Sequence, residues 1–596
     1  MRLVLPALLA TAALVTAGVA LAPARSAQPA ANPAETAFAA LSKRYIEGLA
    51  RLSPTYATTL GDHRYDDQLP DVSAKGRAAG LAFDNQMLAE LAKIDRKKLS
   101  PDSQVDAALL ENSVRYDIWS TNTLQSWAWD TSSYNDIAGG SLYGLAARDF
   151  APWAQRLKAA TARMEKIPAL LAETRRQIVP SRVPEIYAQT LSKQNSGTVD
   201  IAADMLAPHK GELSAADAAR FDAALAGLRT AVAEHQKWID TVLVPAAHAS
   251  GRLGATLYDQ KMRFALQSDL TREQIKARAT QAVADIRAEM YRLARQALAG
   301  KPNAPEMPDS PTAAQQQAAI EAALALSYAQ RPDRTQLMAR TTASLAQITD
   351  FVRAKDLVSM PDAPVKIITM PKFQQGFSVA YDDAPGALEK GLDNFFAVSP
   401  VPDDWTDAQA TSFLSEYNNY MIYDLAVHEA MPGHYLQLFH SNQNPSVIRA
   451  VLGSGPFVEG WAVYAEGMVA DANFLDGDPL FKMTVLKMRL RSVTNSLLDI
   501  GIQTEGMTRD QAMALMTKTA FQQEREAAGK WIRANLSQTQ LLSYFVGYSE
   551  HMALREEAKQ RQGAAFNLKS YNDAVLAHGS PPAKYVRELM FGLPIE

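Results

Sequence analysis

The chain has 596 residues, of which 47% are apolar, so it can bury a large core, and disorder throughout the chain is excluded. Its formal net charge of −4, together with the lack of a concentrated basic run, argues against nucleic acid as a partner. The sequence contains no cysteine, which excludes disulfides, thiolate metal ligands and a lipid-modified cysteine, so a transition-metal site must use His, Asp and Glu.

The N-terminal segment is typical of an export signal. Arg2 precedes an apolar stretch that ends at about Leu21, and the small-residue pattern APA follows at 22–24. We expect cleavage there or after Ala27, which makes residues 1–27 the signal peptide and the mature protein periplasmic or secreted, without stable membrane association. The alternative is an uncleaved membrane anchor, because the apolar stretch approaches the length that spans a bilayer.

The mature chain carries start signals of long amphipathic helices. Residues 32–35, Asn-Pro-Ala-Glu, offer an N-cap, a proline in the first turn and a glutamate at the third position. Residues 271–274 and 508–511 are capping boxes, and residues 213–217 predict a helix that runs toward Val244. We therefore predict a mainly α fold.

A segment rich in proline and polar residues, GKPNAPEMPDSPT, is typical of a surface linker. With the linker placed at 301–313, the chain divides into an N-terminal helical half at 28–300 and a C-terminal catalytic half at 314–596. We expect the two halves to form one integrated fold of two lobes, with the active-site cleft between them.

The exception to the helical pattern lies between Pro364 and about Val398. Two runs of β-branched and aromatic residues, at 365–370 and 377–381, are bounded by proline and glycine and predict a small sheet. One edge of this sheet could hydrogen-bond an extended substrate, and Tyr381 is a candidate substrate contact. The alternative, held equal, is that the strands only cover the core.

The strongest chemical motif is VHEAMPGHYLQ, which contains His428, Glu429 and His434. In the HExxH arrangement two His four positions apart lie about 40° apart around a helix and can face one zinc ion. Here the two His are six positions apart, or about 240° on an ideal helix, so both can be ligands only if the helix is distorted between them. Pro432 and Gly433 supply the means of distortion.

Glu459 follows in FVEGWAVYAE, where a second helix is expected. Glu459 and Glu466 are seven positions apart on one helix face, and two inward carboxylates are unfavourable unless charged partners meet them. A zinc ion explains Glu459 as a third ligand beside His428 and His434, with an open fourth position for water. Glu429 is then the general base that takes a proton from that water.

HEAMPGHYLQ followed by FVEGWAVYAE resembles the bacterial family called domain of unknown function 885, and the blocks MPKF, AYDDAP and LLSYFVGYSEHMALREEAKQRQG extend the resemblance over most of the mature chain. That family is similar to helical zinc metallopeptidases of the gluzincin type. The resemblance implies a zincin-like helical fold and Zn²⁺ as cofactor. It maps His428, His434 and Glu459 to the metal ligands and Glu429 to the catalytic base.

The resemblance also implies roles for two residues near the C-terminus. Tyr544 matches a family tyrosine that could donate a hydrogen bond to a developing oxyanion, with core packing as the alternative. Arg555 is a candidate for binding a substrate carboxylate, with a structural salt bridge as the alternative. Many members carry His where Gln503 stands and Arg where Asn495 stands, which leaves the substrate class open.

Two acidic residues have open roles. Asp499 could orient a ligand, although helix packing is the commoner role for such a residue. Asp424, one turn before His428, could also support a ligand, although an exposed position on the helix surface is the expectation.

Together these features predict an exported zinc metallopeptidase that cleaves short peptides with metal-activated water. An amidase or esterase acting on N-acyl amino acids or other small molecules would use the same residues. A third reading is a periplasmic binding protein that retains zinc without catalysis. Glu429 argues against this last reading, because a non-catalytic site has no reason to keep a base beside its first ligand.

Overall fold

The computed structural model describes residues 32–362, 365–370, 380–389 and 391–596. The expected signal peptide, residues 1–27, lies outside these ranges, as do residues 377–379 of the second predicted strand. Within the described ranges, no helix has the length and apolar character needed to cross a membrane.

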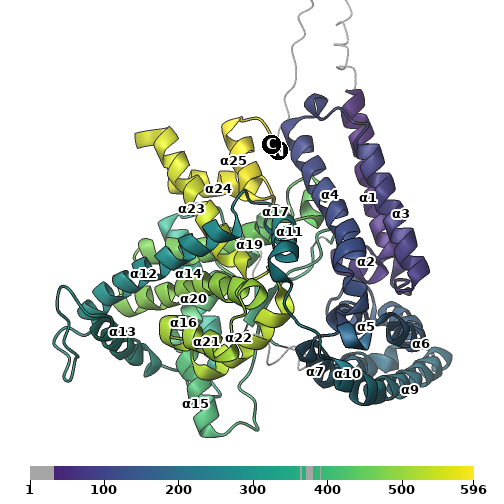
Figure 1. Cartoon of the computed structure of the whole chain (residues 1–596), viewed down its shortest axis with the longest axis horizontal. Coiled ribbons are helices and arrows are strands. Elements are labelled where there is room, and N and C mark those ends of the chain that lie inside the picture. The colour runs from purple at the N-terminus through teal and green to yellow at the C-terminus, as the bar shows by residue number, and fades with distance from the viewer. Residues whose placement is uncertain (1–31, 363–364, 371–379, 390) are drawn as a thin grey trace, which may run out of the picture.

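The first part of the chain is helical, and α1, α3 and α4 lie side by side at the right of Figure 1. The bounds are α1 (Pro33–Leu52), α2 (Pro54–Leu60), α3 (Ala74–Leu91), α4 (Pro101–Trp119), α5 (Thr131–Ala146), α6 (Trp153–Gln177), α7 (Glu185–Gln194), α8 (Gly197–Asp200), α9 (Ala215–Trp238) and α10 (Val244–Ala246).

Helices also dominate the remainder, with one small sheet between α14 and α15. The bounds are α11 (Gly254–Leu266), α12 (Arg272–Ala297), α13 (Ala313–Tyr328), α14 (Leu337–Lys355), α15 (Asp407–Glu416), α16 (Asn419–Glu429), α17 (His434–Ser441), α18 (Val447–Val451), α19 (Gly455–Asp471), α20 (Pro479–Thr504), α21 (Arg509–Ala514), α22 (Glu524–Ser537), α23 (Leu542–Gln562), α24 (Leu568–Ala577) and α25 (Ala583–Phe591). The prediction of a mainly α fold is confirmed.

The predicted helix starts are also confirmed. The Asn32 side chain accepts a hydrogen bond from the backbone N–H of Ala34 and caps α1. Thr271 and Thr508 form complete capping boxes at the starts of α12 and α21. Ser214 caps α9, as the pattern at 213–217 predicts. These side chains satisfy backbone donors that the first helical turn leaves without partners.

The sheet has three strands, β1 (Lys366–Thr369), β2 (Ala380–Asp383) and β3 (Phe395–Val398), in the order β1-β3-β2. β3 pairs parallel with β1 and antiparallel with β2, with Tyr381 opposite Ala397. The small sheet is confirmed, but β3 was not among the predicted runs. β2 lies at one edge, and this edge faces α16.

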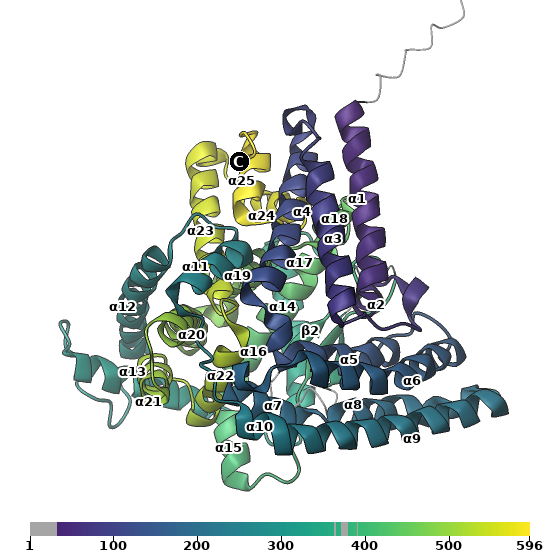
Figure 2. The same cartoon turned by 45° about the vertical axis from the view of Figure 1, so that its right-hand side comes forward.

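The hydrophobic core does not divide at the linker. Met262 of α11 and Met290 of α12 share a core with Leu490 of α20 and Phe545 of α23. Near the C-terminus, Tyr585 of α25 joins the core of α1, α3 and α4, and Figure 2 places α25 beside α4. Residues before and after the linker therefore share hydrophobic cores.

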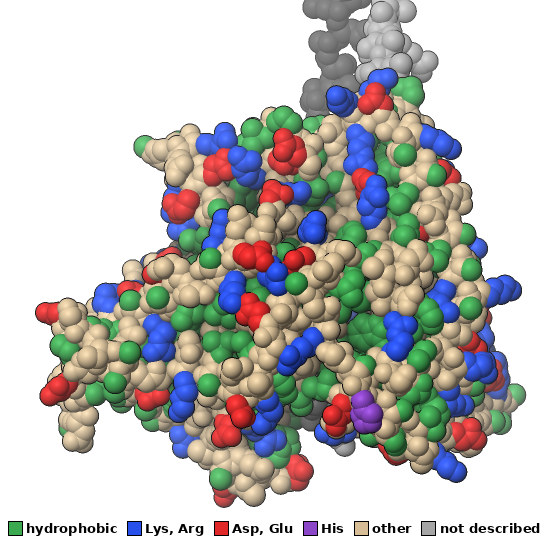
Figure 3. All heavy atoms as spheres, viewed as in Figure 1, with side chains coloured by type: hydrophobic (Ala, Val, Ile, Leu, Met, Phe, Trp, Pro, Cys, Tyr) green, Lys and Arg blue, Asp and Glu red, His purple; other side chains and the backbone are tan. Residues whose placement is uncertain are grey.

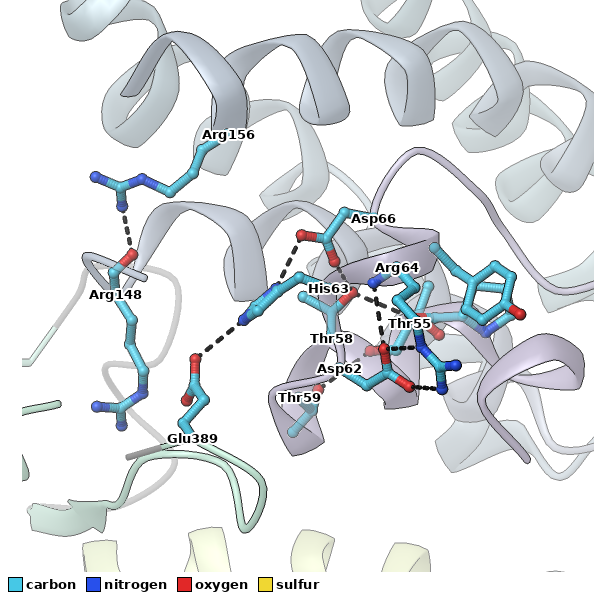
Figure 4. A network of polar contacts seen from close by, with 12 residues as sticks. Thr55, Thr58, Thr59, Asp62, His63, Arg64, Asp66, Arg148, Arg156 and Glu389 are labelled. Atoms are coloured by element: carbon cyan, nitrogen blue, oxygen red, sulfur yellow. Dashed lines mark hydrogen bonds and ion pairs between the residues drawn. The ribbon is translucent and has the colours of Figure 1, made fainter. Parts of the chain in front are cut away.

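The segment that follows β2 is attached to the N-terminal helices. His63 lies between Asp66 and Glu389 (Figure 4), with its Nδ1 2.9 Å from Asp66 Oδ2 and its Nε2 3.1 Å from Glu389 Oε1. Arg148 donates to Asp383 Oδ1 at 2.6 Å. Burial lowers the pKa of His63, but the two carboxylates outweigh it and raise this pKa to about 9. These contacts fix the position of β2.

The surface carries charges of both signs. Over the described part of the face in Figure 3, basic and acidic side chains are interspersed.

Candidate metal centre

The motif helix is interrupted where the spacing of the two His requires it. α16 ends at Glu429 and α17 begins at His434, and the Met431–Pro432 peptide bond between them is cis. Gly433 packs so closely on α16 that a Cβ atom there would lie 1.9 Å from the carbonyl oxygen of His428. Only glycine fits this position. The interruption brings the two imidazole rings to a centroid distance of 4.8 Å.

Helix α19 presents Glu459 to the two His. The Trp461 indole N–H donates to the carbonyl oxygen of Pro432 at 2.9 Å and so ties α19 to the interrupted helix. Gly460 allows α23 to approach, because a Cβ atom there would lie 2.2 Å from the backbone carbon of Gly547. The Gly and Trp that follow Glu459 therefore pack α19 against α23 and against the interrupted helix.

Three ligand atoms converge at this point. Glu459 Oε2 lies 3.8 Å from His428 Nε2 and 3.5 Å from His434 Nε2. One ligand atom from each of these residues lies within 4.8 Å of the others, and they form the group of metal-binding side chains found among the described residues. The side chains remain 12%, 12% and 20% exposed, so solvent reaches them.

His428 also has a carboxylate on its far side. Its Nδ1 lies 2.6 Å from Oε1 of Glu466, whose side chain is only 1% exposed. Because Nδ1 is held by this contact, Nε2 is the nitrogen that faces Glu459. The sequence predicts that the Glu466 carboxylate points inward and has a charged partner, and His428 is a partner for it in the structure.

The charges within the centre reinforce one another. Burial lowers the pKa of His428, but hydrogen bonds with Glu459 and Glu466 outweigh it and hold that pKa well above its ordinary value. Burial raises the pKa of Glu459, but the two His outweigh it and hold that pKa far below its ordinary range. The opposite charges of these side chains thus stabilise one another.

Asp424 corrects one prediction. It was expected on an exposed helix surface, but its side chain is fully buried. Burial, followed by the negative charge of nearby Glu466, raises the pKa of Asp424 well above its ordinary value. Every residue from Tyr420 to Asp424 is buried, because neighbouring helices cover α16 on more than one face. The periodicity of the sequence therefore did not identify position 424 as buried.

A cavity of about 470 Å³ contains the convergent donors. Its walls are Ala380, Tyr381, Asp382, His428, Glu429, His434, Leu438, Val458, Glu459, Arg533 and Tyr544. Glu429 Oε2 accepts a hydrogen bond from the backbone N–H of Asp382 at 3.1 Å, so the edge of β2 holds the carboxylate beside the donors. The structure places the predicted residues Tyr381, Glu429 and Tyr544 in one cavity with the three ligands.

Tyr544 has a partner that the sequence did not identify. Its hydroxyl oxygen accepts a hydrogen bond from Arg533 Nη2 at 2.8 Å. Burial and the charge of Glu459 raise the pKa of Tyr544, so the hydroxyl keeps its proton at neutral pH. Arg533 lies on α22, outside every recognised motif, so no sequence signal connected it with the site.

Arg555 lies apart from this group. Its guanidinium is 5.8 Å from the ring centre of Tyr464, and it does not line the cavity. Among the described residues it makes no ion pair, and its role in binding a substrate carboxylate stays a prediction. Arg533 is the guanidinium at the site.

The positions that depart from the family pattern have structural contacts. Gln503 Oε1 accepts from the backbone N–H of Leu253 at 3.1 Å. Asp499 Oδ1 accepts from the backbone N–H of Thr539 at 3.2 Å, just before α23. Asn495 is buried in α20. Of the two roles considered for Asp499, the contact agrees with helix packing.

Comparison with known proteins identifies relatives of unknown function. Among curated proteins, none matches this chain. A solved structure of a candidate lipoprotein of unknown function from Shewanella oneidensis is similar, with 34% identity, a TM-score of 0.79, and coverage of 93% of this chain and 99% of the other. A candidate lipoprotein from Colwellia psychrerythraea shares the fold at 17% identity, with a TM-score of 0.76 and coverage of 94% of this chain and 99% of the other.

The model of a family described as bacterial protein of unknown function (DUF885) matches residues 54–590. With 537 of its 596 residues matched and a relative that is one-third identical over nearly its whole length, the chain belongs to the DUF885 family.

Proposed function

We propose that this protein is an exported zinc metallohydrolase of peptidase type, with a zincin-like helical fold. The observation that carries the proposal is the convergence of His428, His434 and Glu459 beside Glu429 within one cavity. Three protein ligands with an accessible fourth position are the arrangement of catalytic zinc sites, whereas structural zinc sites use four protein ligands.

The donor atoms fit zinc in spacing and in chemistry. Zn–N bonds of about 2.0–2.1 Å in a tetrahedron place neighbouring ligand atoms about 3.3 Å apart. The two separations that involve Glu459, 3.5 and 3.8 Å, need only a small contraction, and all three ligand atoms lie within 4.8 Å of one another. Imidazole nitrogens and a carboxylate oxygen are ligands that zinc accepts, and the Glu466 contact orients one imidazole in the manner common to metal-binding His.

A bound zinc ion would supply a Lewis acid, which lowers the pKa of a coordinated water and polarises a carbonyl group. Glu429 would accept the proton of the attacking water and pass it to the leaving nitrogen. Its hydrogen bond from Asp382 fixes the carboxylate beside the donors. Tyr544 would donate its hydroxyl hydrogen to the oxygen of the reacting carbonyl, with Arg533 holding the phenol in place.

Export is part of the proposal. The N-terminal pattern of residues 1–27 and the description of both solved relatives as candidate lipoproteins support a location outside the cytoplasm. This sequence contains no cysteine, so it offers no thiol for a lipid chain. We therefore propose that the mature protein acts in the periplasm or is secreted.

Two other functions would use the same centre. An amidase or esterase needs the same ligands and base and would differ only in the substrate cavity. A binding protein that retains zinc would need the ligands but not Glu429 or Tyr544, and both of these line the cavity. Their presence favours an enzyme.

The test is hydrolysis of a panel of dipeptides, tripeptides and N-acyl amino acids by the zinc-loaded protein. Peptide turnover should fall by about two to four orders of magnitude in Glu429→Gln, because that variant keeps the ligands but loses the base. Turnover of N-acyl amino acids alone would replace the peptidase with an amidase. Equal rates in the wild type and Glu429→Gln would refute Glu429 as the base.

A further inference from the structure

A second cavity adjoins the metal centre. It has a volume of about 170 Å³ and lies between α15, α20 and α22, with the chain after β3 closing one side. Its walls are Ser399, Pro400, Pro402, Trp405, Ser412, Phe413, Glu416, Tyr417, Arg491, Gln523, Arg525, Glu526, Gly529, Lys530 and Arg533. Arg533 lines both this cavity and the cavity of the metal centre, so the two share a wall.

The carboxylates in this second cavity are already paired. Glu416 Oε2 lies 2.9 Å from the ammonium nitrogen of Lys487. Glu526 forms an ion pair with Arg491 and also accepts a hydrogen bond from the Tyr417 hydroxyl at 3.1 Å. Both acidic residues therefore have their charges compensated within the protein.

Three basic side chains of the same cavity have no carboxylate within ion-pair distance among the described residues. Arg525 stacks on Trp405, with its guanidinium carbon 3.9 Å from the ring centre. Arg533 donates to two neutral groups, Tyr544 and Gln540. Lys530 is only 5% exposed and makes no hydrogen bond or ion pair with any described residue. These three side chains give the cavity wall a basic character.

Lys530 is the informative member of this group. An ammonium group that is largely withdrawn from water is disfavoured unless an anion lies close to it. Burial, together with the nearby charges of Arg491 and Arg533, accordingly lowers the pKa of Lys530 well below its ordinary value, and it outweighs the opposite effect of the Glu526 and Glu459 carboxylates. An anion in the cavity would supply the missing partner.

The cavity also has an apolar wall. Trp405, Phe413 and Tyr417 stand opposite α22, with Pro400 and Pro402 beside them. Lys530 and Arg533 are three positions apart on α22 and so project from one helix face, with Cβ atoms about 5–6 Å apart.

We propose that this cavity binds the C-terminal residue of a peptide substrate, with its free carboxylate at Lys530 and Arg533 and an apolar side chain against the aromatic wall. The proposal rests on the proposed peptidase function and makes the enzyme a carboxypeptidase that releases a short C-terminal product. An acidic side chain has the same chemistry as a terminal carboxylate, so the two sources must be separated by experiment.

Binding can be measured without turnover in zinc-loaded Glu429→Gln. Isothermal titration would compare acetyl-Ala-Ala-Phe with a free carboxylate, the same peptide as its C-terminal amide, and the amide of acetyl-Ala-Ala-Glu. The free acid should bind about 10- to 100-fold more tightly than either amide, the range expected for a hydrogen bond to a charged group. In the double variant Glu429→Gln, Lys530→Met, the ratio of the affinities for the free acid and the amides should fall to near one.

Two further variants control for damage to the fold. Lys530→Arg keeps the charge and should keep most of the preference for the free acid. Lys518→Met removes an exposed lysine that lies outside the cavity and should leave the ratio unchanged. If the Lys530→Met protein does not fold, the proposal is still tested by comparing the binding of acid and amide peptides to the Glu429→Gln protein.

Several outcomes would overturn the inference. These are equal binding of acid and amide, no binding of any of the peptides, an unchanged ratio in a folded Lys530→Met protein, or equal binding of the glutamyl amide and the free acid. Failure of the proposed function looks different. In that case the wild-type protein would hydrolyse no peptide, while the preference for a free carboxylate would remain.

Discussion

The contact between Glu466 and His428 predicts a specific change in zinc affinity. Glutamine at position 466 keeps the size of the side chain and removes the charge that faces His428 Nδ1 across 2.6 Å. Loss of such a partner typically weakens metal binding by 10–100-fold. Since each factor of ten corresponds to about 1.4 kcal/mol, Glu466→Gln should reduce the zinc-binding free energy by about 1.4–2.8 kcal/mol.

The assay is competition for zinc between the protein and a fluorescent chelator at fixed pH. A matched control is Glu556→Gln, which removes a half-exposed carboxylate that pairs with Lys559 on α23. The control should bind zinc like the wild type. A Glu466→Gln protein that folds and has a zinc dissociation constant within about twofold of the wild-type value would refute the inferred role of this contact.

Three other predictions concern Tyr544, Gly460 and His63. Tyr544→Phe should retain zinc and lose about 10²- to 10³-fold in kcat for peptide hydrolysis, and an unchanged kcat would remove the phenol from the mechanism. Gly460→Ala should destabilise the fold by about 1–3 kcal/mol, measured by thermal unfolding, because its methyl group would overlap Gly547; wild-type stability would contradict the close helix contact. The raised pKa of His63 means that its stabilising contribution is complete below pH 6.5 and is lost as the pH rises to about 9. After allowance for solvent screening, wild type should lose about 1–2 kcal/mol relative to His63→Gln over this interval, and parallel pH profiles of thermal unfolding would contradict the raised pKa.

Sequence reasoning predicted the elements whose causes are local. The caps at Asn32, Thr271 and Thr508 are hydrogen bonds within one helical turn, so a few residues determine them. The interruption of the motif helix was predictable for the same reason. A six-residue spacing is incompatible with one face of a helix, and proline and glycine stand between the two His.

The features that sequence reasoning missed depend on packing between distant segments. Arg533 meets Tyr544 because α22 packs near α23, and neither helix carries a motif that refers to the other. Asp424 is buried because other segments pack on several faces of α16, including the face that was expected to be exposed. β3, with the sequence FFAV, is short, and its pairing with β1 and β2 is set by residues far away.

The placement of Arg555 illustrates the limit of reading a single residue from a resemblance. Position 555 is on the expected helix, α23, yet its side chain lies against Tyr464 rather than in the cavity. Glu459 was more predictable because it had partners at a defined spacing and a chemistry that needed a third ligand. A group of residues that could bind one ion together thus predicts a site better than a single charged residue does.

We propose that His428, His434 and Glu459 bind one zinc ion and that Glu429 acts as the base beside it. The most direct measurement is zinc content, by elemental analysis after dialysis, of the wild type, His434→Ala and Glu429→Gln, together with their rates of peptide hydrolysis. We predict about one zinc ion per chain in the wild type and Glu429→Gln, little zinc in His434→Ala, and hydrolysis by the wild type alone. Equal zinc content in the wild type and His434→Ala would contradict the assignment of the centre.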